Sequence, residues 1–238
     1  EPYFYASTIL KEEPVIATDA EEFQPTFSPD GKEVAYLEER STLKVINLAS
    51  KAVRTIMPGN KNYSYSDGDQ YYDWSPDGKW FLVDFDMENH WISEVGLVSA
   101  AGNSEVINLT KSGYVDEGAR WMMKGKMMLF SSNRDGMKNH GSWGGSSDAY
   151  GMFFTQEAYD RYRLSEADYK LLKEKEDKEK GNGGKSDAST KETSKETDVK
   201  PENITIDFNG LQDRKAKLTI HSSLLGDAII TEDGEKMY

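Results

Sequence analysis

The sequence Phe27-Ser28-Pro29-Asp30-Gly31-Lys32 returns 47 residues later as Trp74-Ser75-Pro76-Asp77-Gly78-Lys79. After a further 47 residues it returns in altered form at 121–126 (WMMKGK), and a more distant copy lies at 230–236 (ITEDGEK). A fixed period of roughly 40–50 residues is typical of the blades of a β-propeller. The spacing therefore predicts an all-β fold, a partial β-propeller of four-stranded antiparallel blades.

The repeated motif has the composition of a tight turn between two strands. Proline fixes φ at the second turn position, aspartate tolerates the third, and glycine accepts the left-handed conformation that closes a hairpin. The third copy has Met122-Met123-Lys124 in place of Ser-Pro-Asp, so its turn must close without proline.

Each repeat is predicted to be an antiparallel meander. The strands expected in the first repeat are 23–27, 33–37, 43–48 and 52–57. Those expected in the second are 71–74, 80–84, 92–98 and 104–109. The third begins with 119–121, 127–130 and 149–154.

A long insertion interrupts the third repeat. Residues 155–180 combine tyrosines and leucines with many charges and predict helix, with Ser165 as a helix cap. Residues 181–201 are rich in Gly, Lys, Ser, Thr and Glu, and we expect them to be disordered. Strand character resumes at 204–208 and continues to residue 218.

The whole chain is interpreted as one propeller region of about 3.5–4 blades. Residues 1–22 would supply strands of a preceding or closing blade. The blades would span 23–69, 70–115 and 116–219, the last with its insertion at 155–203, and 220–238 would start the next blade.

Two interpretations of this blade number remain. We favour a piece of a larger ring, whose open blade edge would pair with the rest of a parent chain or with a second copy. The alternative is a minimal four-blade ring, in which residues 3–7 and 14–18 supply the two strands that the last blade lacks.

Composition excludes several classes of function. The net charge of −13 argues against nucleic-acid binding, because neutralising phosphates needs clustered Lys and Arg. The absence of cysteine excludes disulfides, thiolate metal sites and a cysteine nucleophile. No segment approaches the roughly 18 apolar residues of a membrane span, so no membrane insertion is expected. Residues 1–5 (EPYFY) lack the basic start and apolar run of a signal peptide, so none is expected within this sequence.

No catalytic residue is predicted. The chain has neither a Gly-x-Ser-x-Gly elbow nor a His-Glu-x-x-His zinc helix. His140, Ser142 and Asp148 lie close in sequence, but a catalytic triad is defined by geometry rather than by proximity in sequence. The acidic pairs Asp67/Asp69 and Asp84/Asp86 do not have the spacing of an EF-hand loop, so we expect no metal and no cofactor.

The aromatic residues divide by predicted position. Those expected on strands, which we expect to pack between blades, are Trp74, Trp80, Trp121 and Phe130. Tyr63, Tyr65 and Trp143 are expected on loops, where aromatic side chains often bind ligands. Together with His140, these three are the predicted substrate or partner contacts.

Four further segments carry a more specific resemblance: 131–137 (SSNRDGM), 140–144 (HGSWG), 155–162 (TQEAYDRY) and 206–214 (IDFNGLQDR). With the turn repeats, they resemble the N-terminal propeller region of tricorn-like serine peptidases, bacterial enzymes of the C-terminal-processing type. The turn repeats alone also resemble TolB-type propellers.

The resemblance implies a non-catalytic propeller that gates or positions peptides or unfolded protein substrates for a downstream peptidase domain. It also implies a periplasmic or cell-envelope location, with the cytoplasm as the alternative. None of the family's catalytic residues has a match in this chain. The main alternative is a TolB-type module for protein–protein binding, and a self-standing small propeller enzyme is a third.

Overall fold

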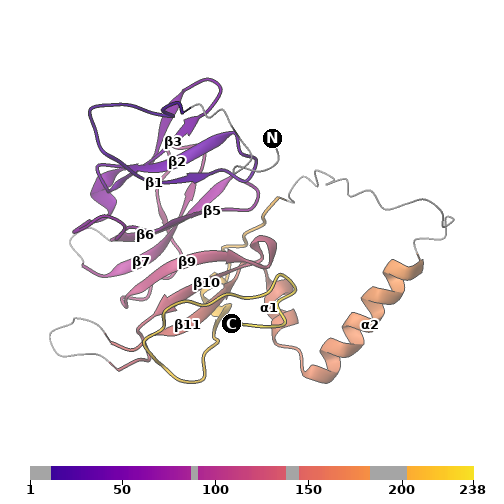
Figure 1. Cartoon of the computed structure of the whole chain (residues 1–238). Helices are drawn as coiled ribbons and strands as arrows, with labels where there is room; N and C mark the ends of the chain where they lie inside the picture. Colours follow the sequence, from indigo (N-terminus) through magenta and orange to yellow (C-terminus); the bar gives the residue numbers. More distant parts are fainter. Residues whose placement is uncertain (1–11, 87–90, 138–144, 183–202) are drawn as a thin grey trace.

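The computed structural model of the chain describes residues 12–86, 91–137, 145–182 and 203–238. Three four-stranded antiparallel sheets follow one another along the chain, with two helices beside the third (Figure 1). The predicted fold class is confirmed: the protein is mostly β and is built from blade-like sheets.

The strands run in chain order across each sheet. The first sheet contains β1 (Glu22–Phe27), β2 (Glu33–Glu38), β3 (Thr42–Asn47) and β4 (Val53–Met57). The second contains β5 (Tyr72–Trp74), β6 (Trp80–Asp86), β7 (Ser93–Ser99) and β8 (Ile107–Asn108). The third contains β9 (Asp116–Met122), β10 (Met127–Ser132), β11 (Asp148–Phe153) and β12 (Lys215–Lys217).

The sheets pack face to face because their strands carry apolar residues on both sides. On β6, Phe81 and Val83 face the first sheet and Leu82 faces the third, as the two-residue period of a strand requires. On β10, Met128 and Phe130 face the second sheet, whereas Met127 and Leu129 face the opposite way. The predicted core aromatics are confirmed: Trp74, Trp121 and Phe130 are buried and Trp80 packs partly buried against the same core.

Chain outside the sheets covers the two outermost faces. Val34, Tyr36 and Ile46 of the first sheet are covered in part by Ile16. The far face of the third sheet packs against a helix and the C-terminal segment through Ala158, Leu225 and Ile230, among other residues. Both faces are thereby removed from water, which favours folding.

The repeated motif forms the same locked turn in the first, second and fourth repeats. In the first, the Ser28 hydroxyl donates to Asp30 (2.8 Å) and accepts from the Glu33 N–H (3.0 Å). The Gly31 N–H donates to the Ser28 carbonyl (2.9 Å), and Gly31 has a φ of 69°. Ser75 and Thr231 make the equivalent bonds in their own turns. The third repeat closes instead through Met123, Lys124 and Gly125, which all have positive φ values.

The insertion is helical where the structure describes it. Helix α1 (Gln156–Tyr162) is capped by the Thr155 hydroxyl, and α2 (Glu166–Asn182) begins at Ser165, whose hydroxyl accepts from the Asp168 N–H (3.2 Å). The predicted helix and its Ser165 cap are confirmed. Among the described residues, no helix is long and apolar enough to cross a membrane.

Two predicted strands are wrong. Residues 204–208 form no strand; Ile204 and Ile206 pack against the core, while the Arg214 guanidinium binds the carbonyl of Asp207 in place of a neighbouring strand. Only Lys215–Lys217 completes the third sheet. Residues 14–18 also form no strand, because Ile16 packs onto the face of the first sheet rather than pairing at an edge.

Some predictions fall outside the described residues. These are the strand at 3–7 and most of the disordered segment predicted at 181–201. Elsewhere the observed strand ends differ from the predicted ones by at most three residues, with β8 shorter and β9 longer than predicted.

The turn lock gives a first prediction. Ser28→Ala removes the acceptor of the Glu33 N–H and one donor to Asp30, so the free energy of unfolding should fall by about 1–2 kcal/mol. Urea unfolding measures this change. The matched control is Ser28→Thr, because Thr231 already fills this role in the fourth repeat. If Ser28→Ala and the wild type were equally stable, the hydrogen bonds of the Ser28 hydroxyl would not stabilise the turn.

The same turn predicts a titration. The hydrogen bond from Ser28, followed by those from Lys32, lowers the pKa of Asp30 to about 2. The ionised Asp30 side chain therefore stabilises the folded state at pH values above the ordinary carboxyl pKa. This contribution to stability is lost as the pH falls toward 2. NMR titration of Ser28→Ala should find the Asp30 pKa raised toward 3.8. An unchanged pKa would show that Ser28 does not set it.

Candidate functional site

The antiparallel connections define two ends of the stacked sheets. Connections alternate between ends along a meander, so the link between β4 and β5 lies at the same end as the link between β6 and β7. We call this the loop end. The locked turns and the helices α1 and α2 follow strands that run the other way, and we call their side the turn end.

Three exposed aromatic rings gather at the loop end. Tyr63 and Tyr65 lie between β4 and β5, and Trp91 leads into β7. The ring centroids are 4.7 Å apart for Tyr63 and Tyr65, 5.3 Å for Tyr63 and Trp91, and 6.0 Å for Tyr65 and Trp91. The three side chains are 56%, 63% and 75% exposed. We call this group the aromatic cluster.

Hydrogen bonds within the loop hold the two tyrosines in place. The Asp69 carboxylate accepts from the Ser64 hydroxyl (2.7 Å), from the Ser66 N–H (2.9 Å) and from the Tyr65 N–H. The Gln70 side-chain amide donates to the Tyr63 carbonyl (2.9 Å). The backbone that carries both rings is therefore fixed by the loop's own side chains.

Acidic groups border the aromatic cluster. Asp86, at the end of β6, has its pKa raised by burial, and a hydrogen bond from the Tyr63 N–H opposes that effect. Burial, Tyr63 and the negative charge of Asp86 together raise the pKa of Tyr65. Asp67 forms an ion pair with Arg40 (2.5 Å).

The structure brings together two of the four predicted contact residues. Tyr63 and Tyr65 lie side by side and exposed, and their role in binding stays a prediction. His140 and Trp143 lie outside the described residues. Trp91 was missed. Its position just before the third strand of a blade indicates the end of the sheet at which it lies, but its contact with Tyr63 is visible only in the structure.

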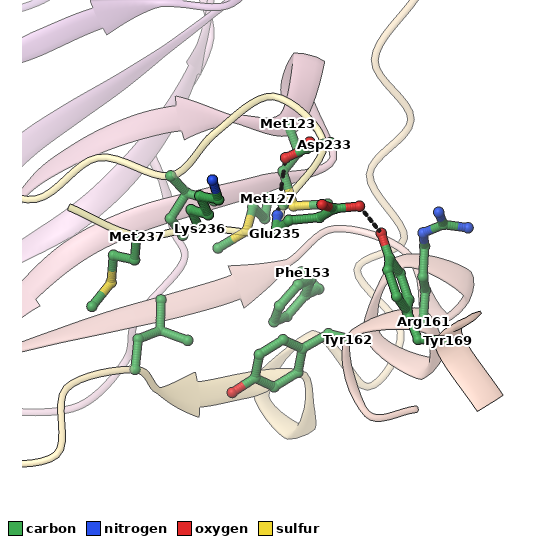
Figure 2. Close-up of a pocket in the computed structure, with 13 residues that line it drawn as sticks. Met123, Met127, Phe153, Arg161, Tyr162, Tyr169, Asp233, Glu235, Lys236 and Met237 are labelled. Atoms are coloured by element: carbon green, nitrogen blue, oxygen red, sulfur yellow. Dashed lines mark hydrogen bonds between the residues drawn. The ribbon is translucent and has the colours of Figure 1, made fainter. Parts of the chain in front are cut away.

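A second concave site lies at the turn end. Figure 2 shows a pocket of about 240 Å³ between the third sheet, the helices and the fourth turn. Its apolar wall includes Met123, Met127, Phe153, Tyr162 and Met237.

The polar rim of this pocket is paired internally. The Tyr169 hydroxyl donates to Glu235 (3.1 Å), and Lys173 forms an ion pair with the same carboxylate. Arg161 pairs with Glu176 (2.5 Å) and lies over the Tyr169 ring, 5.2 Å from its centroid. These contacts tie α2 to the fourth turn, so the rim acts as a brace between the insertion and the fourth repeat.

Carboxylates at the junction of the second and third sheets have raised pKa values. Burial raises the pKa of Asp84 well above its usual range, with Glu117 and Asp86 adding to the effect. Both Asp84 oxygens lie 3.0 Å from the Gly118 N–H, which donates to them. Burial also raises the pKa of Asp73, which accepts from the Trp121 N–H (3.1 Å). Asp73 and Asp84 therefore link the second sheet to the third, because they accept hydrogen bonds from backbone N–H groups of β9.

None of the described His, Asp and Glu side chains form a group of three or more that could hold a metal ion. Asp148 is buried and accepts from the hydroxyls of Thr219 and Ser222 (both 2.6 Å). Burial raises its pKa, but these bonds and Lys217 outweigh that effect and lower it overall. Asp148 therefore acts as a structural anchor, while His140 and Ser142 lie outside the described residues.

Comparison with solved structures supports the fold. The chain is similar to part of the tricorn protease, with a TM-score of 0.54 and 10% identity over 85% of this chain and 17% of that one. It is also similar to TolB from Acinetobacter baumannii (TM-score 0.44, 23% identity, 60% of this chain and 32% of that one). A third similar structure is a protein assigned as TolB from Agrobacterium tumefaciens. Its TM-score is 0.41, and the two sequences are 21% identical over 58% of this chain and 44% of that one.

The likeness to part of the tricorn protease supports a propeller-like fold. The chain spans less than half the length of each of the three proteins. At these identities, the likeness to the tricorn protease shows a shared fold alone. No protein-family model matches the chain, and no curated protein is a significant match.

The buried carboxylate of Asp84 gives a prediction that depends on pH. Asp84→Asn keeps an acceptor for Gly118 and removes the buried charge, so at pH 7 it should be at least as stable as the wild type. Asp84→Ala leaves the Gly118 N–H without this partner and should lose about 1–3 kcal/mol.

The sign of the pH dependence follows from the raised pKa. The folded wild type binds this proton more tightly than the unfolded chain, so its stability rises relative to Asp84→Asn as the pH falls. Urea unfolding at pH 7 and pH 5 measures the difference between the two. An advantage of Asp84→Asn that grows on acidification would contradict this account.

Proposed function

We propose that this chain is a non-catalytic β-propeller segment that binds peptides or unfolded protein at its loop end. Within a larger protein, it would act as the substrate gate or scaffold of a tricorn-like serine peptidase. The catalytic groups would then belong to another part of that protein.

The aromatic cluster is the observation that carries this proposal. Exposed tyrosine and tryptophan side chains offer large contact areas and lose little conformational entropy on binding. The three rings contact one another and so form a contiguous exposed apolar patch, which is a feature of interaction sites more than of scattered surface residues. A loop fixed by Asp69 presents them without the entropic penalty of ordering the backbone.

Two further features support a binding role without chemistry. The polar side chains of the pocket at the turn end are engaged in internal pairs, Tyr169 with Glu235 and Arg161 with Glu176, which join α2 to the fourth turn and to α1. The chain also shares its fold with part of the tricorn protease, a likeness consistent with a segment of a larger peptidase. Under this proposal, the parent protein works in the bacterial periplasm or cell envelope.

Binding to casein, an unstructured protein, tests the proposal. Isothermal titration calorimetry should detect weak binding by the wild type, and gel analysis should detect no cleavage. Removing two rings with Tyr63→Ala and Trp91→Ala together should weaken binding about tenfold or more, since stacked aromatic contacts contribute roughly 1–3 kcal/mol each.

The control is Phe208→Ala, which removes an exposed aromatic residue at the other end of the sheets. It should bind casein as the wild type does. Cleavage of casein by the purified chain, or full binding by the double variant, would overturn the proposal. Binding only to one folded protein would favour a TolB-type interaction module instead.

A further inference from the structure

We propose that the aromatic cluster selects positively charged side chains, so that the peptides bound at the loop end are held through an arginine or a lysine. This inference rests on the proposed peptide binding and names the chemical class of the ligand. The recognising groups are the faces of Tyr63, Tyr65 and Trp91 together with the carboxylate of Asp86.

The geometry of the rings leaves their faces available. The ring planes are inclined by 66° for Tyr63 and Tyr65, by 33° for Tyr63 and Trp91, and by 48° for Tyr65 and Trp91. Rings inclined in this way do not cover one another's faces as parallel stacking would. With more than half of each side chain exposed, π surface remains for a ligand.

A cation is the ligand that such faces attract most strongly. The quadrupole of an aromatic ring places negative potential on its face, and a guanidinium or ammonium group within about 6 Å of the centroid is stabilised. Several rings around one cation add their contributions, and tryptophan contributes the most. Trp91 is the most exposed of the three rings.

The charges beside the cluster favour the same ligand. Asp86 lies close enough to hydrogen-bond the Tyr63 N–H and to raise the pKa of Tyr65. The Asp69 carboxylate lies in the same loop and accepts hydrogen bonds from Ser64, Tyr65 and Ser66.

Two described cations belong to this region: Arg40 is paired with Asp67, and Lys61 lies in the same loop as the tyrosines. The carboxylates of Asp67, Asp69 and Asp86 outnumber them. A basic peptide therefore meets complementary charge, whereas an acidic peptide would be repelled by a chain of net charge −13.

A matched pair of peptides tests the inference. One is a short unstructured peptide with a single central arginine, and its twin carries citrulline, which has the same shape and no charge. Isothermal titration calorimetry measures both dissociation constants, because the chain has five tryptophans and its fluorescence does not report on Trp91 alone. The wild type should bind the arginine peptide about 3- to 30-fold more tightly.

Variants separate cation binding from simple apolar contact. Tyr63→Leu and Trp91→Leu keep apolar bulk but remove the π face, so each should shrink the preference for arginine. Asp86→Asn should shrink the preference through charge. Phe208→Leu is the control and should leave it unchanged. Circular dichroism and thermal melting check that each variant is folded.

The outcomes distinguish this inference from the proposed function. Equal binding of the arginine and citrulline peptides, with both weakened by Trp91→Ala, would leave peptide binding intact and overturn the preference for cations. Binding of neither peptide would overturn both proposals. A preference that persists unchanged in Trp91→Leu and Tyr63→Leu would place the charge recognition elsewhere and also overturn the inference.

Discussion

A four-stranded sheet that carries apolar residues on both faces is stable in water only when something covers each face. This constraint organises the molecule: Phe81 and Val83 point one way from β6 and Leu82 the other, so the second sheet needs a neighbour on both sides. The first and third sheets provide those neighbours. Their own outer faces are covered by Ile16 on one side and by α1 with the C-terminal segment on the other. Each blade thus depends on the next, which is the physical basis of propeller assembly.

In these stacked sheets, the polar groups that stabilise the fold and the exposed side chains available for binding lie in different places. The locked turns, Asp84 and Asp148 use their polar groups to satisfy backbone and hydroxyl partners inside the protein. At the turn end, the polar rim of the pocket is likewise engaged in internal pairs. The aromatic cluster differs, because its rings remain largely exposed while their backbone is fixed. A rigid support with uncommitted side chains is what a binding surface requires.

The sequence predicted the blades because their signals are local. A turn needs particular residues at fixed positions, and Ser28 and Thr231 form the same hydrogen bonds despite their different side chains. The strand predicted at 204–208 is wrong because alternation of apolar residues cannot reveal that Arg214 will take the Asp207 carbonyl. Trp91 escaped notice for a similar reason. Its contact with Tyr63 joins two loops that only the assembled sheet brings together.

The central claim is that the loop end, and not the pocket at the turn end, receives a peptide. Hydrogen–deuterium exchange of the wild-type chain, with and without a saturating arginine-containing peptide, tests it most directly. The account predicts slower exchange in residues 58–71 and 91–95, with unchanged exchange in the turns at 28–33, 75–80 and 231–236. Protection confined to α1, α2 and 231–237, with none around the aromatic cluster, would contradict it.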